Sequence, residues 1–282
     1  IFASETCALD IIGAELVREV ENGEIIIINK DGIESVKPFP KQNPRPCIFE
    51  YIYFSRPDSI VGGKGVYEYR KNLGKQLAIE SPSEVDIVSS VPDSGNPAAI
   101  GYSEQSKIKF DMGIIRNHYV GRTFIEPTQQ IRQLGVKLKH NPNKALIKNK
   151  KLVLIDDSIV RGTTSKKIVS MLYDAGAKEV HMKISSPPIK YPDYYGIDTP
   201  NVEELLAANN SIEEMRKIIG VKTLSFLSID GVYKALGHNK RDDKNPQFTD
   251  HCFTGDYPVK PMDLKNQNDK NNQLSLLSNV IG

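Results

Sequence analysis

One continuous segment, residues 152–164, constrains what this 282-residue chain can fold into more than any other. Four apolar residues run into two adjacent acids, Asp156 and Asp157, and a loop rich in hydroxyls that carries one glycine follows. Apolar residues then recur at helical spacing between positions 168 and 175. The segment therefore predicts a buried strand, a short loop and the N-terminus of a helix.

This arrangement suits phosphate chemistry. Free N–H groups and the positive end of the dipole make a helix N-terminus a site for phosphate. Two carboxylates beside such a cradle can hold a divalent metal ion or the hydroxyls of a sugar. The same pattern also fits an ordinary strand–turn–helix with two solvated acids, so the segment alone leaves both interpretations open.

Composition limits the partners that the chain can have. A net charge of +2, with 26% charged residues, gives no general attraction to nucleic acid or to a membrane surface, so phosphate binding must be local. The apolar runs are far shorter than a membrane span. Three widely spaced cysteines form no disulfide framework, which favours a reducing compartment. We expect a cytoplasmic protein with no nucleic-acid or membrane partner.

From about residue 47 the pattern predicts an α/β fold. Apolar runs expected to be strands (86–91, 108–115, 152–155 and 179–185) alternate with helical patterns, which favours a parallel sheet with helices on both faces. Ligands bind beyond the carboxyl ends of such strands. Three polar pairs stand at predicted strand ends: Asp93 and Ser94, Arg116 and Asn117, and Asp156 and Asp157.

The flanking segments differ in character. Residues 14–36 predict a small antiparallel meander, and prolines between positions 37 and 46 mark a linker. A helix or helix pair is expected over residues 203–219. The polar tail after about residue 262 shows little periodicity, and we expect it to be loosely ordered.

Several motifs in the same order resemble those of the amidophosphoribosyltransferases. The acid pair and its loop are similar to the phosphoribosyl-diphosphate (PRPP) loop of type I phosphoribosyltransferases in general. Further matches narrow the resemblance to one family, between about residue 3 and about residue 258. These matches are SETCA at 4–8, EYIYFSRPDS at 50–59, VPDS at 91–94, YVGRTFI at 119–125 and ISSPP at 184–188.

The resemblance implies a domain organisation. The family's intact enzyme begins with a glutaminase domain whose nucleophile is an N-terminal cysteine, whereas this chain begins with Ile1, and Cys7 lies inside a matched motif. We therefore expect residues 1–45 to be a β-rich remnant of that domain with a linker. Residues 46–225 would form the type I phosphoribosyltransferase domain, and 226–282 a partly disordered extension.

The implied reaction transfers ammonia, supplied by glutamine in the intact enzyme, to C1 of PRPP. The products would be 5-phosphoribosylamine and diphosphate, in the first step of de novo purine biosynthesis. The resemblance also implies purine nucleotide inhibitors and a homo-oligomer, and no glutaminase activity is expected from this chain alone. Two alternatives are a salvage phosphoribosyltransferase and a PRPP- or nucleotide-binding regulator without turnover.

Each part of PRPP suits different residues. The 5′-phosphate suits the PRPP loop, and Asp156 and Asp157 suit the ribose hydroxyls, directly or through a metal. The diphosphate calls for Mg²⁺, an ion that prefers oxygen ligands; by resemblance its positions are Ser94, Asp156 and Asp157. The predicted substrate-binding residues are Asp93, Ser94, Ser158, Ile159, Val160, Arg161, Gly162, Thr163 and Thr164.

A cationic segment, residues 117–140, resembles the family's flexible loop, which closes over PRPP. Arg122 and Lys139 belong to it, and by resemblance they are catalytic together with Asp156 and Asp157. A solvated surface helix is the alternative for this segment. The chain departs from the family pattern nearby, because we expect Lys at the position of Arg116 and Arg at that of His118.

One branch of the family carries an iron–sulfur cluster on four cysteines. This chain matches that pattern at Cys47 and near Cys252, whereas Asp193 and Thr249 stand at the other two positions. Two thiolates cannot complete the usual four ligands, so we do not expect an iron–sulfur cluster. A cluster with a substitute ligand remains the alternative to two isolated reduced cysteines.

Overall fold

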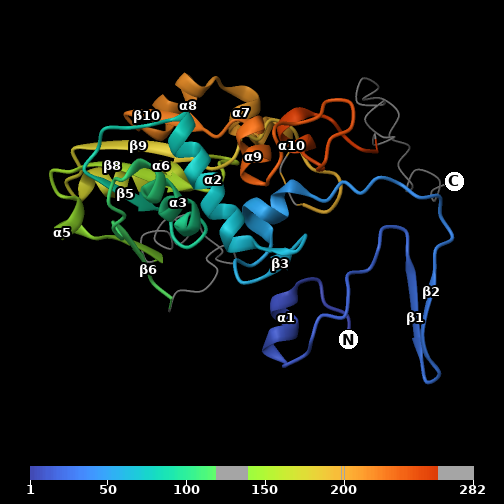
Figure 1. Cartoon of the computed structure of the whole chain (residues 1–282). Helices are drawn as coiled ribbons and strands as arrows, with labels where there is room; N and C mark the ends of the chain where they lie inside the picture. Colours follow the sequence, from blue (N-terminus) through green and yellow to red (C-terminus); the bar gives the residue numbers. More distant parts are fainter. Residues whose placement is uncertain (119–138, 198, 200, 260–282) are drawn as a thin grey trace, which may run out of the picture.

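The computed structural model describes residues 1–118, 139–197, 199 and 201–259. Its centre is a parallel sheet with the strand order β10-β9-β8-β5 (Figure 1). The strands are β1 (Ile25–Asn29), β2 (Gly32–Val36), β3 (Ile60–Val61), β4 (Lys64–Gly65), β5 (Ile87–Ser90), β6 (Ile114–Arg116), β7 (His140–Pro142), β8 (Lys151–Asp156), β9 (Glu179–Ile184) and β10 (Thr223–Phe226).

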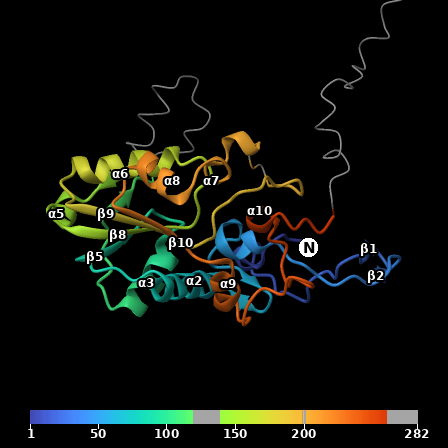
Figure 2. The same ribbon diagram turned by 90° about the horizontal axis from the view of Figure 1, so that it is seen from above.

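Helices lie on both faces of this sheet. They are α1 (Thr6–Ile11), α2 (Val66–Glu80), α3 (Asn96–Ser106), α5 (Lys144–Ile147), α6 (Thr163–Asp174), α7 (Leu206–Asn209), α8 (Ile212–Ile219), α9 (Ile229–Ala235) and α10 (His251–Thr254), with a π-helical turn η1 (Glu50–Phe54) and a 3₁₀ turn η3 (Val202–Glu204). Figure 2 shows α6 and α8 on one side of the sheet and α2, α3 and α9 on the other. The predicted parallel α/β architecture is confirmed.

Alternation along β8 explains why both faces are covered. Val153 and Ile155 pack into the core that contains α2, α3 and α9, whereas Leu152 and Leu154 pack into the core that contains α6 and α8. All four side chains are fully buried. Successive side chains of a strand point to opposite faces, so an unbroken apolar run requires a helical layer on each side.

Several local predictions need correction. The expected meander over residues 14–36 is a single hairpin, in which Ile25 pairs with Val36 and Asn29 with Gly32. The expected strand over 108–115 shrinks to β6, because Phe110 makes only an isolated bridge, and β6 pairs with β7 outside the main sheet. The pattern also missed β10 and α9.

The N-terminal segment contacts the rest of the fold mainly through the start of α1. The Glu5 carboxylate accepts hydrogen bonds from the Arg56 N–H at 2.6 Å and the Ser59 hydroxyl at 2.8 Å. The hairpin β1–β2 lies away from the sheet (Figure 1). Its isoleucines are largely solvent-exposed, with Ile33 at 72%. Within the described residues, no helix is long and apolar enough to cross a bilayer.

A buried lysine in β9 makes stability depend on pH. Lys183 is 2% exposed, donates to the Ser81 hydroxyl and lies 5.9 Å from the centre of the Tyr102 ring. Burial lowers the pKa of Lys183 to about 8, from 10.5. Between these values the unfolded chain binds a proton that the folded chain has lost, so the free energy of unfolding should rise with pH. Urea unfolding across this interval measures the rise.

The matched variant is Lys183→Met, which keeps the apolar stem and removes the charge. Other groups titrate in the same interval, so the comparison with this variant isolates the lysine. The variant should be more stable than the unaltered chain near neutral pH, and its stability should rise less as the pH increases. Equal pH dependence in both chains would contradict the assignment.

Candidate functional site

The predicted polar pairs meet at the carboxyl edge of the sheet. Strands β5 and β8 are parallel neighbours with Ser90 opposite Ile155, so the loops that follow them leave side by side (Figure 1). The Val91 N–H donates to the Ile155 carbonyl at 2.8 Å, which places the start of the first loop over the end of β8. Arg116, at the end of β6, forms an ion pair with Asp93 in that loop.

A glycine allows this loop to approach β8. A Cβ atom on Gly95 would lie 2.5 Å from the Ile155 carbonyl oxygen and 2.9 Å from the Val91 oxygen. Real Cβ atoms do not come so close to backbone oxygens, so any larger residue must move the loop. The position of Asp93 and Ser94 therefore depends on Gly95.

We expect Gly95→Ala to weaken PRPP binding by at least roughly tenfold, or about 1.4 kcal/mol. The added methyl group must push the loop away from β8 and misplace Asp93 and Ser94. Isothermal titration calorimetry with PRPP and Mg²⁺ measures the change. Gly65→Ala is the control, because nothing lies within 4 Å of a Cβ there; equal affinity in both variants would contradict the loop's role.

The two acids are buried next to each other. Asp156 is 7% exposed and Asp157 6%. The Asp157 N–H donates to an oxygen of Asp156 at 3.0 Å, and the Ser158 hydroxyl donates to Asp157 at 2.6 Å. Burial, and secondly the charge of Asp157, raises the pKa of Asp156 well above its ordinary value. The pair therefore favours a ligand that supplies positive charge or hydroxyl donors.

Sequence reasoning missed one cation on this side of the sheet. Arg70 in α2 is 4% exposed, and it donates to the Tyr51 carbonyl at 3.1 Å and to the Ser55 carbonyl at 2.6 Å. Burial lowers the pKa of Arg70, and the charge of Asp157 is the largest effect that opposes this shift. Position 70 was part of a helical pattern, and no local signal marked it as buried.

The loop after the acids ends at an open helix N-terminus. Gly162 precedes α6 with a left-handed φ of 73°, and no side chain caps the first turn. Thr163 and Thr164 are exposed there. The N–H groups of this turn are therefore free of side-chain partners and suit an anion.

Other members of the loop anchor it. Ile159 is 2% exposed, so its side chain packs into the core and does not face a ligand. The Val160 carbonyl accepts from the Leu206 N–H at 2.9 Å. Arg161 forms an ion pair with Glu204 at 2.6 Å, on an exposed surface. The predicted substrate role of the Arg161 side chain stays a prediction.

The donor set fits a magnesium ion that is shared with a substrate. Ser94, Asp156 and Asp157 offer oxygen ligands. Burial, and secondly the charge of Asp157, raises the pKa of Asp156, and a bound cation would offset both effects. Within the described residues, no group of three or more His, Cys, Asp or Glu side chains could hold a metal ion. Mg²⁺ commonly takes one or two carboxylates and completes its shell with substrate phosphates and water.

The cationic segment is described only at its ends. Arg122 lies outside the described residues, as does the rest of 119–138. Lys139 directly precedes β7, and its carbonyl accepts from the Asn117 N–H at 2.8 Å. Strands β6 and β7 are antiparallel, with Arg116 opposite His140. Lys139 and Arg116 therefore lie at the same end of this strand pair.

The parallel sheet, its helical layers and the acidic loop at its carboxyl edge define a type I phosphoribosyltransferase fold. An amidophosphoribosyltransferase of Rhizobium etli is 59% identical over 284 residues, which cover 99% of this chain and 57% of that protein. Over nearly its whole length the chain is therefore similar to amidophosphoribosyltransferases, and the resemblance in its motifs is confirmed.

Other relatives agree. The Bacillus subtilis amidophosphoribosyltransferase is 53% identical over 260 residues, covering 92% of this chain and 54% of that protein. The solved structure of the B. subtilis glutamine PRPP amidotransferase, complexed with ADP and GMP, matches with a TM-score of 0.83 and covers 91% of this chain and 56% of that one. The chain thus spans about half the length of these relatives. No protein-family model matches it.

Proposed function

We propose that this chain binds PRPP with Mg²⁺ at the carboxyl ends of β5 and β8 and transfers ammonia to its C1 atom. The products are 5-phosphoribosylamine and diphosphate, in the first step of de novo purine biosynthesis. The observation that carries the proposal is the buried pair Asp156 and Asp157 beside the uncapped N-terminus of α6. The names of the relatives favour this function over a salvage enzyme or a regulator without turnover.

Different residues bind different parts of PRPP in this proposal. Backbone N–H groups of 158–164 and the hydroxyls of Thr163 and Thr164 hold the 5′-phosphate, and Asp156 and Asp157 hold the ribose hydroxyls. Ser94 and the acid pair would hold Mg²⁺, which would offset charge on the diphosphate. Asp93 and Ser94 face the diphosphate from the loop that Gly95 allows to lie close to β8.

The chemical step requires this chain to stabilise the diphosphate as it leaves. As the bond from C1 to the diphosphate oxygen breaks, negative charge grows on the leaving group and the ribose becomes oxocarbenium-like. Cations close to the diphosphate then contribute most to catalysis. Arg122 and Lys139 take this role in the proposal, from the motif resemblance. Arg116 becomes available if the diphosphate replaces Asp93 as its partner.

The proposal extends to partners and organisation. Purine nucleotides inhibit the enzyme in this proposal, a suggestion supported by the ADP and GMP bound to the B. subtilis relative. Residues 1–45 form a glutaminase remnant with a linker, 46–225 the phosphoribosyltransferase domain and 226–282 an extension. Glutamine supplies ammonia in the longer protein, which we place in the cytoplasm as a homo-oligomer.

Diphosphate release from PRPP by the purified 282-residue chain tests the proposal. The rate should rise with ammonium and should not respond to glutamine. Calorimetry should show magnesium-dependent PRPP binding that Asp156→Ala or Thr163→Ala weakens. Glutamine-driven release would disprove the domain assignment, and unchanged PRPP affinity in both variants would disprove the site.

A further inference from the structure

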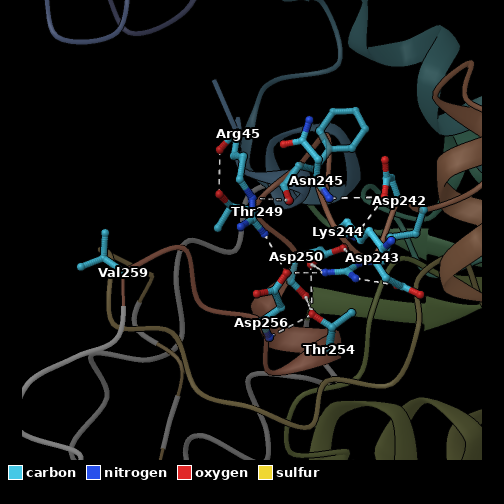
Figure 3. Close-up of polar contacts among 12 residues, drawn as sticks. Arg45, Asp242, Asp243, Lys244, Asn245, Thr249, Asp250, Thr254, Asp256 and Val259 are labelled. Carbon is cyan, nitrogen blue, oxygen red and sulfur yellow. Dashed lines mark hydrogen bonds and ion pairs between the residues drawn. The ribbon is translucent and has the colours of Figure 1, made fainter. Parts of the chain in front are cut away.

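Four positions far apart in the sequence meet at one corner of the fold. Residues 47 and 249 form a parallel bridge, in which the Ile48 N–H donates to the Thr249 carbonyl at 3.1 Å. The Thr249 hydroxyl donates to the Arg45 carbonyl at 2.7 Å, and Figure 3 shows these two residues side by side. Asp193 reaches the same corner, where its carboxylate lies 2.7 Å from Nε2 of His251, the neighbour of Cys252.

These are the positions at which one branch of the family carries four cysteines, and the donor set here does not fit a cluster. An iron–sulfur cluster usually takes four thiolate ligands, but only two of these positions carry a thiol, Cys47 and Cys252, and the other two are Asp193 and Thr249.

The other two positions already have partners. One oxygen of Asp193 accepts from the Tyr195 N–H at 2.7 Å and the Ile197 N–H at 3.0 Å, and the other faces His251. The ring centre of Tyr257 lies 4.8 Å from that of the imidazole and holds it in place.

We infer that this corner is cross-linked without a metal. The contact between Asp193 and His251 ties the segment after β9 to α10, and Thr249 ties the start of α10 to the segment at Cys47. Three separate stretches of chain are thereby joined by polar contacts at the positions of a four-cysteine cluster. The inference concerns the assembly of the fold and is independent of the proposed reaction.

A double-mutant cycle on the full 282-residue chain tests the cross-link. Asp193→Asn keeps an oxygen for the two N–H donors but removes the charge that faces His251. We expect Asp193→Asn and His251→Ala each to lower the urea midpoint, and the double variant to fall less than the sum of the two single shifts. Cys47→Ser is the control and should leave the midpoint nearly unchanged.

Iron content gives a second, independent readout. After anaerobic incubation with ferrous iron and sulfide, the chain should hold no more iron than Cys47→Ser, and an iron chelator should not shift its urea midpoint. Stoichiometric iron that Cys47→Ser loses would overturn the inference. Strictly additive shifts in the cycle, or no shift in Asp193→Asn, would overturn it as well.

Discussion

Asp156→Asn should unfold at a higher temperature than the unaltered chain at neutral pH, yet bind PRPP with Mg²⁺ roughly 10- to 100-fold more weakly. The variant removes a charge that burial and Asp157 oppose, and its oxygen can still accept from the Asp157 N–H. The lost affinity corresponds to about 1.5–3 kcal/mol for a hydrogen bond to a charged group. Differential scanning calorimetry and PRPP titration measure the two effects.

The pH dependence of stability tests separately whether the pKa of Asp156 is raised by folding. Because the pKa of Asp156 is higher in the folded chain than its ordinary 3.8, the folded chain binds more protons above that pH. Asp156 therefore stabilises the folded chain at low pH, and this stabilisation is lost as the pH rises through the pKa that Asp156 has in the folded chain. Asp156→Asn should reduce this fall.

Asp174→Asn is the matched control for charge. It removes one negative charge from the exposed far end of α6, so stability should change by less than about 0.5 kcal/mol and PRPP affinity should stay the same. A lower unfolding temperature in Asp156→Asn would contradict the proposal that the buried charge of Asp156 beside Asp157 destabilises the fold.

Asp250→Ala should cost about 3–5 kcal/mol of folding free energy, as expected for a broken buried ion pair. The Asp250 carboxylate is fully buried and accepts from Arg241 Nε at 2.7 Å, the Tyr233 hydroxyl at 2.8 Å and the Thr254 hydroxyl at 3.0 Å. Figure 3 shows Asp250 at the centre of this network, with Thr254 and Asp256 beside it. Urea unfolding measures the loss.

The same guanidinium supplies the control. Asp243 also pairs with Arg241, at 2.8 Å, but its side chain is 90% exposed. Asp243→Ala should therefore cost less than about 1 kcal/mol, since exposed ion pairs contribute little. Similar losses in both variants would show that burial of Asp250 does not set the strength of the network.

The site was predictable where its signal is local. Apolar β8, the acids and the start of α6 lie within one short run, and a buried strand between two helical layers must be apolar throughout. The loop at Asp93 was predictable for a related reason, because carboxyl ends of parallel strands share one edge of the sheet. Its close approach to β8 through Gly95 was not, since that depends on a backbone oxygen 60 positions away.

Short or amphipathic elements escaped prediction. Strand β10 has four residues, and only its pairing with β9 makes it a strand. The hairpin at β1 was expected to be part of a larger meander, because four consecutive isoleucines are a strong strand signal whether or not other strands cover them. Periodicity in the sequence indicates whether a segment favours a strand or a helix. It does not indicate which other segments pack against it.

The sequence by itself determined the α/β class, the family and the position of the acidic loop, because these depend on residues that are close together in the chain. Only the tertiary structure decided which charges are buried. Lys183 beside Ser81, Arg70 near Asp157 and Asp193 against His251 each join segments more than 50 residues apart. The free energy of a charged side chain depends on the solvent and partners around it, and folding alone brings those partners together.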